Sequence, residues 1–187
     1  MPPRVKVTKE EIVDAAVELI RESGAGALNA RTIAVRLQCS TQPVFSNFAN
    51  MDELRLAVLM RADALCREMI RRETESGLYP PYKSGGMGYI RFAREEKELF
   101  KLLYMRDRTN EDMSLDSDLS NEMIAMVRQN TGISEMEARL FHLEMWAFVH
   151  GIATMFATGF VDLEWDLVSR MVSDIYLGHR KLYESEE

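Results

Sequence analysis

Three side chains able to read DNA bases, Arg31, Thr41 and Gln42, lie close together in the sequence. A Gln amide can hydrogen-bond adenine at two atoms, a Thr methyl group can pack on that of thymine, and an Arg can bond to guanine or grip a phosphate. The segment that carries them, Leu28 to Phe48, predicts two very short helices separated by a tight turn. This pattern is what a helix-turn-helix DNA reader needs.

Two helices of about eight residues each are not stable alone, so a third helix must support them. The preceding segment supplies it, because Thr8 and Glu11 have the spacing of a capping box and an apolar face follows as far as Ser23. Asn29 and Ser40 are then the predicted N-caps of the two short helices.

The rest of the chain has helical periodicity throughout, which predicts an all-α fold of about nine helices. A long helix is expected from Met51, capped by Asn50, to about Ser76. The turn-rich connector YPPYKSGGMG follows, and its GGMG is a flexible start to the next helix rather than a phosphate-binding loop. The remaining predictions are two helices between Tyr89 and Met105, an exposed loop from Asp107 to Asn121, and helices to about Asn130, from Glu135 to about Thr158 and from about Asp162 to Tyr183. Ser134 and Glu137 have the spacing of a second capping box, at the start of the helix from Glu135.

Charge is unevenly distributed along this acidic chain, whose net charge is −7. Residues 1–50 hold six basic and five acidic side chains, a balance of +1, and the other 137 residues hold 17 and 25, a balance of −8. The amino-terminal end therefore permits contact with DNA phosphates, although the contrast alone does not establish it. No apolar run is long enough to span a bilayer, which places the protein in the cytoplasm.

Patterns that would indicate catalysis or metal binding are absent from the sequence. Paired Glu-x-x-His motifs, HExxH and serine-nucleophile elbows do not occur, and Cys39 and Cys66 have no zinc-ligand spacing. His142 and His150 favour buried or interface roles over metal binding. We therefore expect that the protein is not an enzyme and that it has neither a metal site nor a cofactor.

The run from Thr8 to Val58 resembles the amino-terminal domain of TetR/AcrR-type transcriptional regulators, through the segments LNARTIA, CSTQPVFSNF and NMDEL. The resemblance implies a helix-turn-helix domain at residues 1–49 and a ligand-binding and dimerisation domain at residues 50–187. It also implies a homodimer that binds a palindromic double-stranded DNA operator, usually represses, and is released by a small-molecule effector.

The same resemblance assigns roles to individual residues. Arg31 and Thr32 would reach the duplex, Ser40, Thr41 and Gln42 would enter the major groove, and Asn47 would contact a phosphate. The predicted DNA-binding set is Arg31, Thr32, Ser40, Thr41, Gln42, Phe45 and Asn47.

Three residues depart from the family pattern. Gln38 stands where the turn glycine is frequent, so a left-handed backbone there would be strained. Phe45 occupies a frequent tyrosine position and Met51 a frequent lysine position, so phosphate contacts are lost. The chain could accordingly be a helical dimer with degenerate DNA binding that acts as a ligand- or protein-binding module, and this alternative stays open.

Two further sets of residues are predicted for the carboxy-terminal part. Methionine and aromatic side chains could line a pocket for an apolar or amphipathic effector, although each is also a reasonable core residue; they are Met60, Met87, Tyr89, Phe92, Phe100, Tyr104, Met105, Met123, Met126, Trp146 and Phe156. The last two helices would form the dimer interface through His150, Gly151, Ala153, Ala157, Leu167, Met171 and Ile175.

Overall fold

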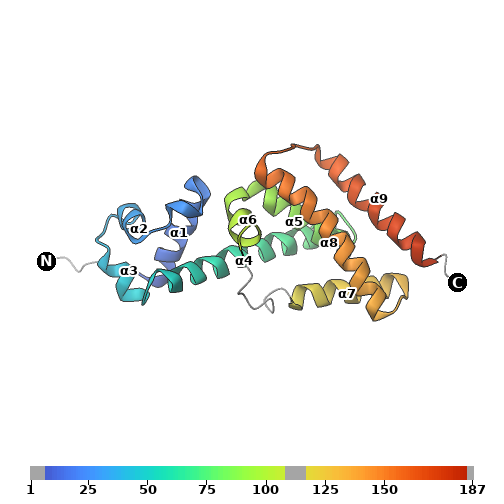
Figure 1. Ribbon diagram of the computed structural model, residues 1–187, viewed down its shortest axis with the longest axis horizontal. Helices are drawn as coiled ribbons and strands as arrows, with labels where there is room; N and C mark the ends of the chain where they lie inside the picture. The colour runs from blue at the N-terminus through green and yellow to red at the C-terminus, as the bar shows by residue number, and fades with distance from the viewer. Residues whose placement is uncertain (1–6, 108–116, 185–187) are drawn as a thin grey trace. The chain divides into compact units, whose positions relative to one another are not determined.

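The computed structural model describes residues 7–107 and 117–184, and every regular element within these residues is helical (Figure 1). This confirms the predicted all-α class. The elements are α1 (Lys9–Ser23), a 3₁₀ turn (Ala25–Ala27), α2 (Ala30–Arg36), α3 (Gln42–Asn47), α4 (Met51–Glu75), α5 (Pro81–Glu95), α6 (Lys97–Tyr104), α7 (Ser117–Thr131), α8 (Glu135–Thr158) and α9 (Trp165–Glu184).

Three of the N-caps predicted from the sequence are confirmed, at the starts of α1, α8 and α4. At α1, the Glu11 amide donates to Thr8 Oγ1 at 3.1 Å and the Thr8 amide donates to Glu11 Oε2 at 2.8 Å. Ser134 and Glu137 form the same reciprocal pair at α8, with distances of 3.3 and 2.7 Å. Asn50 Oδ1 accepts two backbone amides at the start of α4. Each cap pairs amides that have no partner inside the helix.

The prediction for the start of α5 is wrong. Beyond Pro80 the segment YPPYKSGGMG is not a connector, because α5 begins at Pro81 and runs through all three glycine positions. A Cβ added at Gly88 would lie 2.7 Å from Ile70 Cα of α4, so glycine here allows two helix backbones to approach closely. A turn and a close helix crossing call for the same residue type, and the sequence does not distinguish them.

The predicted loop from Asp107 to Asn121 is also partly wrong. Residues 108–116 lie outside the described part of the chain, and from Ser117 onward the segment is the first turn of α7. The last helix begins at Trp165, a few residues later than the predicted Asp162.

The chain divides into two compact units, each described here by itself. Unit 1 comprises Met1–Arg67 and Glu96–Arg106, and unit 2 comprises Glu68–Glu95 and Asp107–Glu187. In unit 1, α1 packs against α2, α3 and α6, and in unit 2, α8 packs against α5, α7 and α9. The unbroken helix α4 contributes to both units (Figure 1). The domain boundary between residues 49 and 50 stays a prediction.

Each unit buries its own apolar core. In unit 1 the fully buried side chains include Ile12, Ile20, Ile33, Val44, Phe48, Leu54, Leu99 and Phe100. In unit 2 they include Met87, Ile90, Phe92, Val127, Phe141 and Val168. The aliphatic and aromatic positions that gave the sequence its helical period are therefore the positions that hold the helices together.

Helix α8 is the most apolar element. Among the described residues it is the one helix whose length and composition would let it cross a membrane, and 39% of its apolar window is buried inside the protein. Packing against three neighbouring helices accounts for that buried share, since core helices of globular proteins have similar compositions.

Candidate nucleic-acid interface

The amino-terminal end of α2 is fixed by its cap. Asn29 Oδ1 accepts the amides of Arg31 and Thr32 at 3.1 and 3.0 Å. Thr32 Oγ1 donates to the carbonyl of Ala27 at 2.7 Å, so this half-buried hydroxyl serves the local fold. Arg31 is exposed beside it, and its guanidinium is the group at this helix end that can reach a ligand.

The turn between α2 and α3 has the strained geometry expected from the sequence. Gln38 has φ of +52°, and it is the one non-glycine residue with positive φ among the described residues. The turn is closed by the Cys39 amide, which donates to the carbonyl of Ala34 at 2.9 Å. The cost of the left-handed conformation is about 1–2 kcal/mol for a residue with a Cβ.

Helix α3 presents a small exposed face that carries most of the predicted base readers. Val44 and Phe48 are each 1% exposed and anchor the helix, whereas Thr41 and Gln42 are exposed. Ser40 is exposed too, but it is not the N-cap that the sequence predicted, because that position is held by Thr41 without a side-chain cap bond.

Sequence reasoning missed Ser46. It lies one helical turn after Gln42, exposed on the same side as Phe45, and its hydroxyl donates to the Gln42 carbonyl at 2.9 Å. The spacing of four residues from Gln42 could have identified it.

Asn47 is engaged inside the unit. Its Nδ2 donates to the carbonyls of Pro43 at 2.8 Å and Val7 at 3.3 Å, so its side-chain amide ties α3 to the segment that precedes α1. The role of Asn47 as a phosphate contact stays a prediction. Its hydrogen bonds within the unit also stabilise the position of α3.

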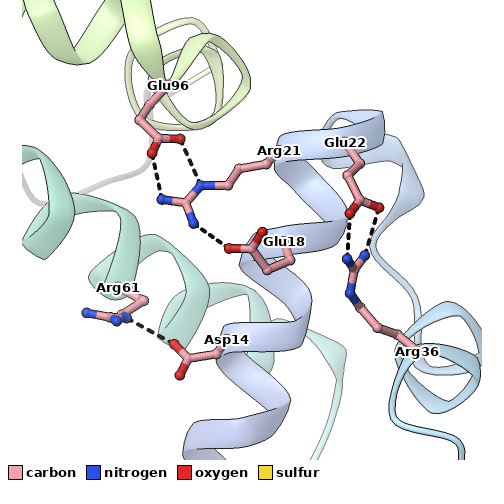
Figure 2. Close-up of polar contacts among 7 residues, drawn as sticks. All are labelled: Asp14, Glu18, Arg21, Glu22, Arg36, Arg61 and Glu96. Atoms are coloured by element: carbon pink, nitrogen blue, oxygen red, sulfur yellow. Dashed lines mark hydrogen bonds and ion pairs between the residues drawn. The ribbon is translucent and has the colours of Figure 1, made fainter.

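Ion pairs join α1 to the helices around it (Figure 2). Arg36 of α2 bonds to both carboxylate oxygens of Glu22, at 2.8 and 2.5 Å, and this contact lowers the pKa of the Glu22 carboxyl. Arg61 of α4 bonds to Asp14 at 3.1 Å. These contacts fix α1 against α2 and α4.

The most buried of these ion pairs joins α1 to α6. Arg21 Nε and Nη2 donate to the two oxygens of Glu96 at 2.8 and 2.6 Å, and Nη1 donates to Glu18 (Figure 2). The side chain of Glu96 is 19% exposed. The hydrogen bonds to Glu96 raise the pKa of the Arg21 guanidinium, which strengthens its attachment to α6 through a charge-assisted contact.

Within the described residues of the amino-terminal segment, most cations are paired with carboxylates. Among the basic residues of the described positions 7–50, Lys9 is paired with Glu53 at 2.9 Å, and Arg21 and Arg36 are paired as above. Arg31 is the one basic residue in that range with no carboxylate within salt-bridge distance. The described part of the interface therefore presents mainly neutral hydrogen-bonding and apolar groups.

The residues predicted for an effector pocket fall in both units. In unit 1, Met60 and Met105 are exposed, Tyr104 is half-buried and Phe100 is buried. In unit 2, Met87, Tyr89, Phe92 and Phe156 are buried, Met123 and Met126 are half-buried, and Trp146 is 45% exposed. The pocket itself stays a prediction.

Two tyrosine–histidine pairs connect α5 to α8 inside unit 2. Tyr82 Oη lies 3.1 Å from His142 Nδ1, and Tyr89 Oη lies 2.9 Å from His150 Nδ1. Burial lowers the pKa of both histidines and raises that of Tyr82. Trp146 stacks on His150 with ring centroids 4.9 Å apart.

The residues predicted for dimerisation separate into two groups. Ala153 and Ala157 are 0% and 1% exposed and lie in the core of their own unit. The remaining members are half-buried or exposed: His150, Gly151, Leu167, Met171 and Ile175. The two alanines are therefore covered by their own chain.

Two family models match this chain. Residues 12–58 match the model described as bacterial regulatory proteins, tetR family, and residues 83–175 match the model described as tetracyclin repressor-like, C-terminal domain. Among curated proteins, none matches the chain significantly.

Solved structures share the fold at low sequence identity. A TetR-like transcriptional regulator from Rhodococcus sp. RHA1 has a TM-score of 0.68 and 17% identity, over 95% of this chain and 97% of that one. A protein of unknown function from the same organism has a TM-score of 0.75 and 19% identity, over 95% and 98%. The multidrug binding protein EbrR, solved with malachite green, has a TM-score of 0.61 and 16% identity, over 93% and 98%.

Proposed function

Because this chain belongs to the TetR family and is a DNA-binding transcriptional regulator, we propose that it acts as a homodimeric repressor of a palindromic operator. We further propose that it works in the cytoplasm and that a small apolar or amphipathic effector releases it from DNA.

The observation that carries this proposal is the exposed face of α3. Val44 and Phe48 anchor the helix from beneath, while Thr41, Gln42 and Ser46 point outward with groups that can bond to base edges. A helix of this size, supported by α1 and α2, suits the major groove.

Selection from random duplexes tests the proposal. The dimer should enrich an inverted repeat, and Gln42→Ala should relax the preference at one base pair per half-site at a cost of about 1–3 kcal/mol. Because Arg31 is the main unpaired cation of the described interface, the selection should be run at low salt. An enriched pool without a repeat would contradict the proposal and favour the alternative of a ligand- or protein-binding module.

Exposed faces of α8 and α9 support the homodimer. Gly151 and Gly178 lie inside these helices, yet nothing in the protomer stands within 4 Å of where their Cβ atoms would be. A glycine inside a helix costs about 1 kcal/mol relative to alanine, so its use there suits the close approach of a second chain. Exposed apolar side chains lie on the same two helices: Met136, Leu140, Leu143, Leu167, Leu177 and Leu182.

A charge on this face should separate the protomers. Leu143 is 57% exposed, so Leu143→Glu introduces little strain within one chain and should yield monomers in sedimentation velocity. The matched control is Leu78→Glu, at a 72% exposed leucine outside α8 and α9, which should leave the dimer intact. Dimers that persist in Leu143→Glu would place the interface elsewhere.

The composition of the core supports an apolar or amphipathic effector. Among the described residues, Glu73 and Ser84 are the buried polar or charged side chains. The buried apolar side chains of unit 2 include methionines and aromatic rings: Met87, Tyr89, Phe92, Phe141, Met145 and Phe156. Methionine adapts to irregular apolar ligands. EbrR, which shares the fold, is a multidrug binding protein solved with malachite green.

Malachite green is a suitable first probe of induction. Its binding should quench tryptophan fluorescence and weaken operator affinity, since an effector shifts the equilibrium only by binding one state more tightly. A panel of such dyes that binds without changing operator affinity would contradict release by this ligand class.

A further inference from the structure

The outward face of α3 includes a large hydrocarbon group. Phe45 is 54% exposed, although its neighbour Val44 is 1% exposed. The ring lies on the same side of the helix as Gln42 and Ser46, so it belongs to the surface that would meet DNA. Exposing a phenyl ring to water is unfavourable by itself, and contact with another apolar group would remove that cost.

A phenyl ring cannot bond to phosphate, because it has no donor hydrogen. The major groove offers one apolar group, the C5-methyl group of thymine, and phenylalanine is among the side chains that contact it. The surrounding residues fit this partner, since α3 itself has no basic residue and Lys9, above the ring of Phe48 at 4.7 Å, is paired with Glu53.

We infer that Phe45 is a specificity-determining residue that selects a thymine in each half-site by packing on its methyl group. The inference rests on the proposed entry of α3 into the major groove. A tyrosine at this position could hydrogen-bond a DNA phosphate, whereas Phe45 would contact a base and so contribute to sequence specificity.

Removal of the thymine methyl group measures this contact directly. The selected duplex is prepared with each symmetric pair of thymines replaced in turn by deoxyuridine, which deletes the methyl and keeps the base pair. Replacement of one of these thymine pairs should weaken binding by about fourfold per half-site, or about fifteenfold in total, as the burial of one methyl group predicts.

A double-mutant cycle assigns the loss to the ring. Phe45→Ala should bind the thymine and deoxyuridine duplexes equally, and its melting temperature should match the wild type because the ring is exposed. Ser46→Ala, on the same face, should keep the full discrimination. Thr41→Ser removes a methyl group that could itself pack on a thymine, and this variant should also keep the discrimination between the two duplexes.

The outcomes separate this inference from the function on which it rests. A chain that selects no duplex overturns both. A selected palindrome whose deoxyuridine sensitivity survives in Phe45→Ala, or disappears in Thr41→Ser instead, overturns the role of Phe45 and leaves the proposed function standing.

Discussion

Replacing Gly88 by alanine should destabilise the protein, although alanine is the better helix former. The new Cβ would lie 2.7 Å from Ile70 Cα, 3.2 Å from Glu73 Cβ and 3.3 Å from Ile70 Cγ1. The first of these atoms is backbone, so α4 and α5 must move apart. Overpacking of this kind costs about 1–3 kcal/mol, at the upper end for a backbone clash, and helix propensity returns about 1 kcal/mol. The expected net loss is about 1–2 kcal/mol.

Thermal unfolding followed by circular dichroism measures the effect. For a chain of this length, 1 kcal/mol corresponds to about 2–4 °C, so Gly88→Ala should melt about 2–8 °C lower than the wild type. The matched control is Gly151→Ala, also inside a helix but with open space around its Cβ, measured at a concentration where the protein is monomeric. This control should gain up to about 1 kcal/mol. Equal shifts in both variants would show that the contact with Ile70 has no part in the loss.

Three further predictions follow from local geometry. Gln38→Gly should raise stability by up to about 1 kcal/mol in urea unfolding, because glycine relieves the left-handed strain, and Gln38→Ala should not. Stability should fall as pH drops below about 6.5, since burial lowers the pKa of His142 and His150 in the folded state and the unfolded chain takes up the protons first; a pH series of melts checks this. Glu96→Gln should cost about 1–3 kcal/mol in unfolding, with a smaller loss in a background that already carries Arg21→Ala.

Local signals in the sequence were sufficient for much of the fold. The capping boxes at Thr8 and Ser134 involve residues three apart, so they can be recognised without knowing any tertiary contact. The left-handed backbone at Gln38 was predictable for another reason, because Gln38 stands where the family that the chain resembles frequently has its turn glycine.

Contacts between distant segments were not predictable in the same way. The close contact of Gly88 could not be predicted, because its partner, Ile70, lies on another helix. The ion pair of Arg21 and Glu96 joins residues 75 positions apart, and no pattern in either segment predicts it. The burial of Ala153 likewise depends on how other helices pack against α8.

The separation of the ion pairs in Figure 2 from the face of α3 has a consequence for how this protein can evolve. The pairs join α1 to α2, α4 and α6, and α3 is held by apolar anchors and by Asn47. Substitutions at Gln42, Phe45 and Ser46 therefore disturb neither the charges nor the core. After gene duplication, two copies could diverge toward different promoters by a few changes on this face while both remain equally well folded. The same independence makes the face a convenient site for engineering new operator preferences.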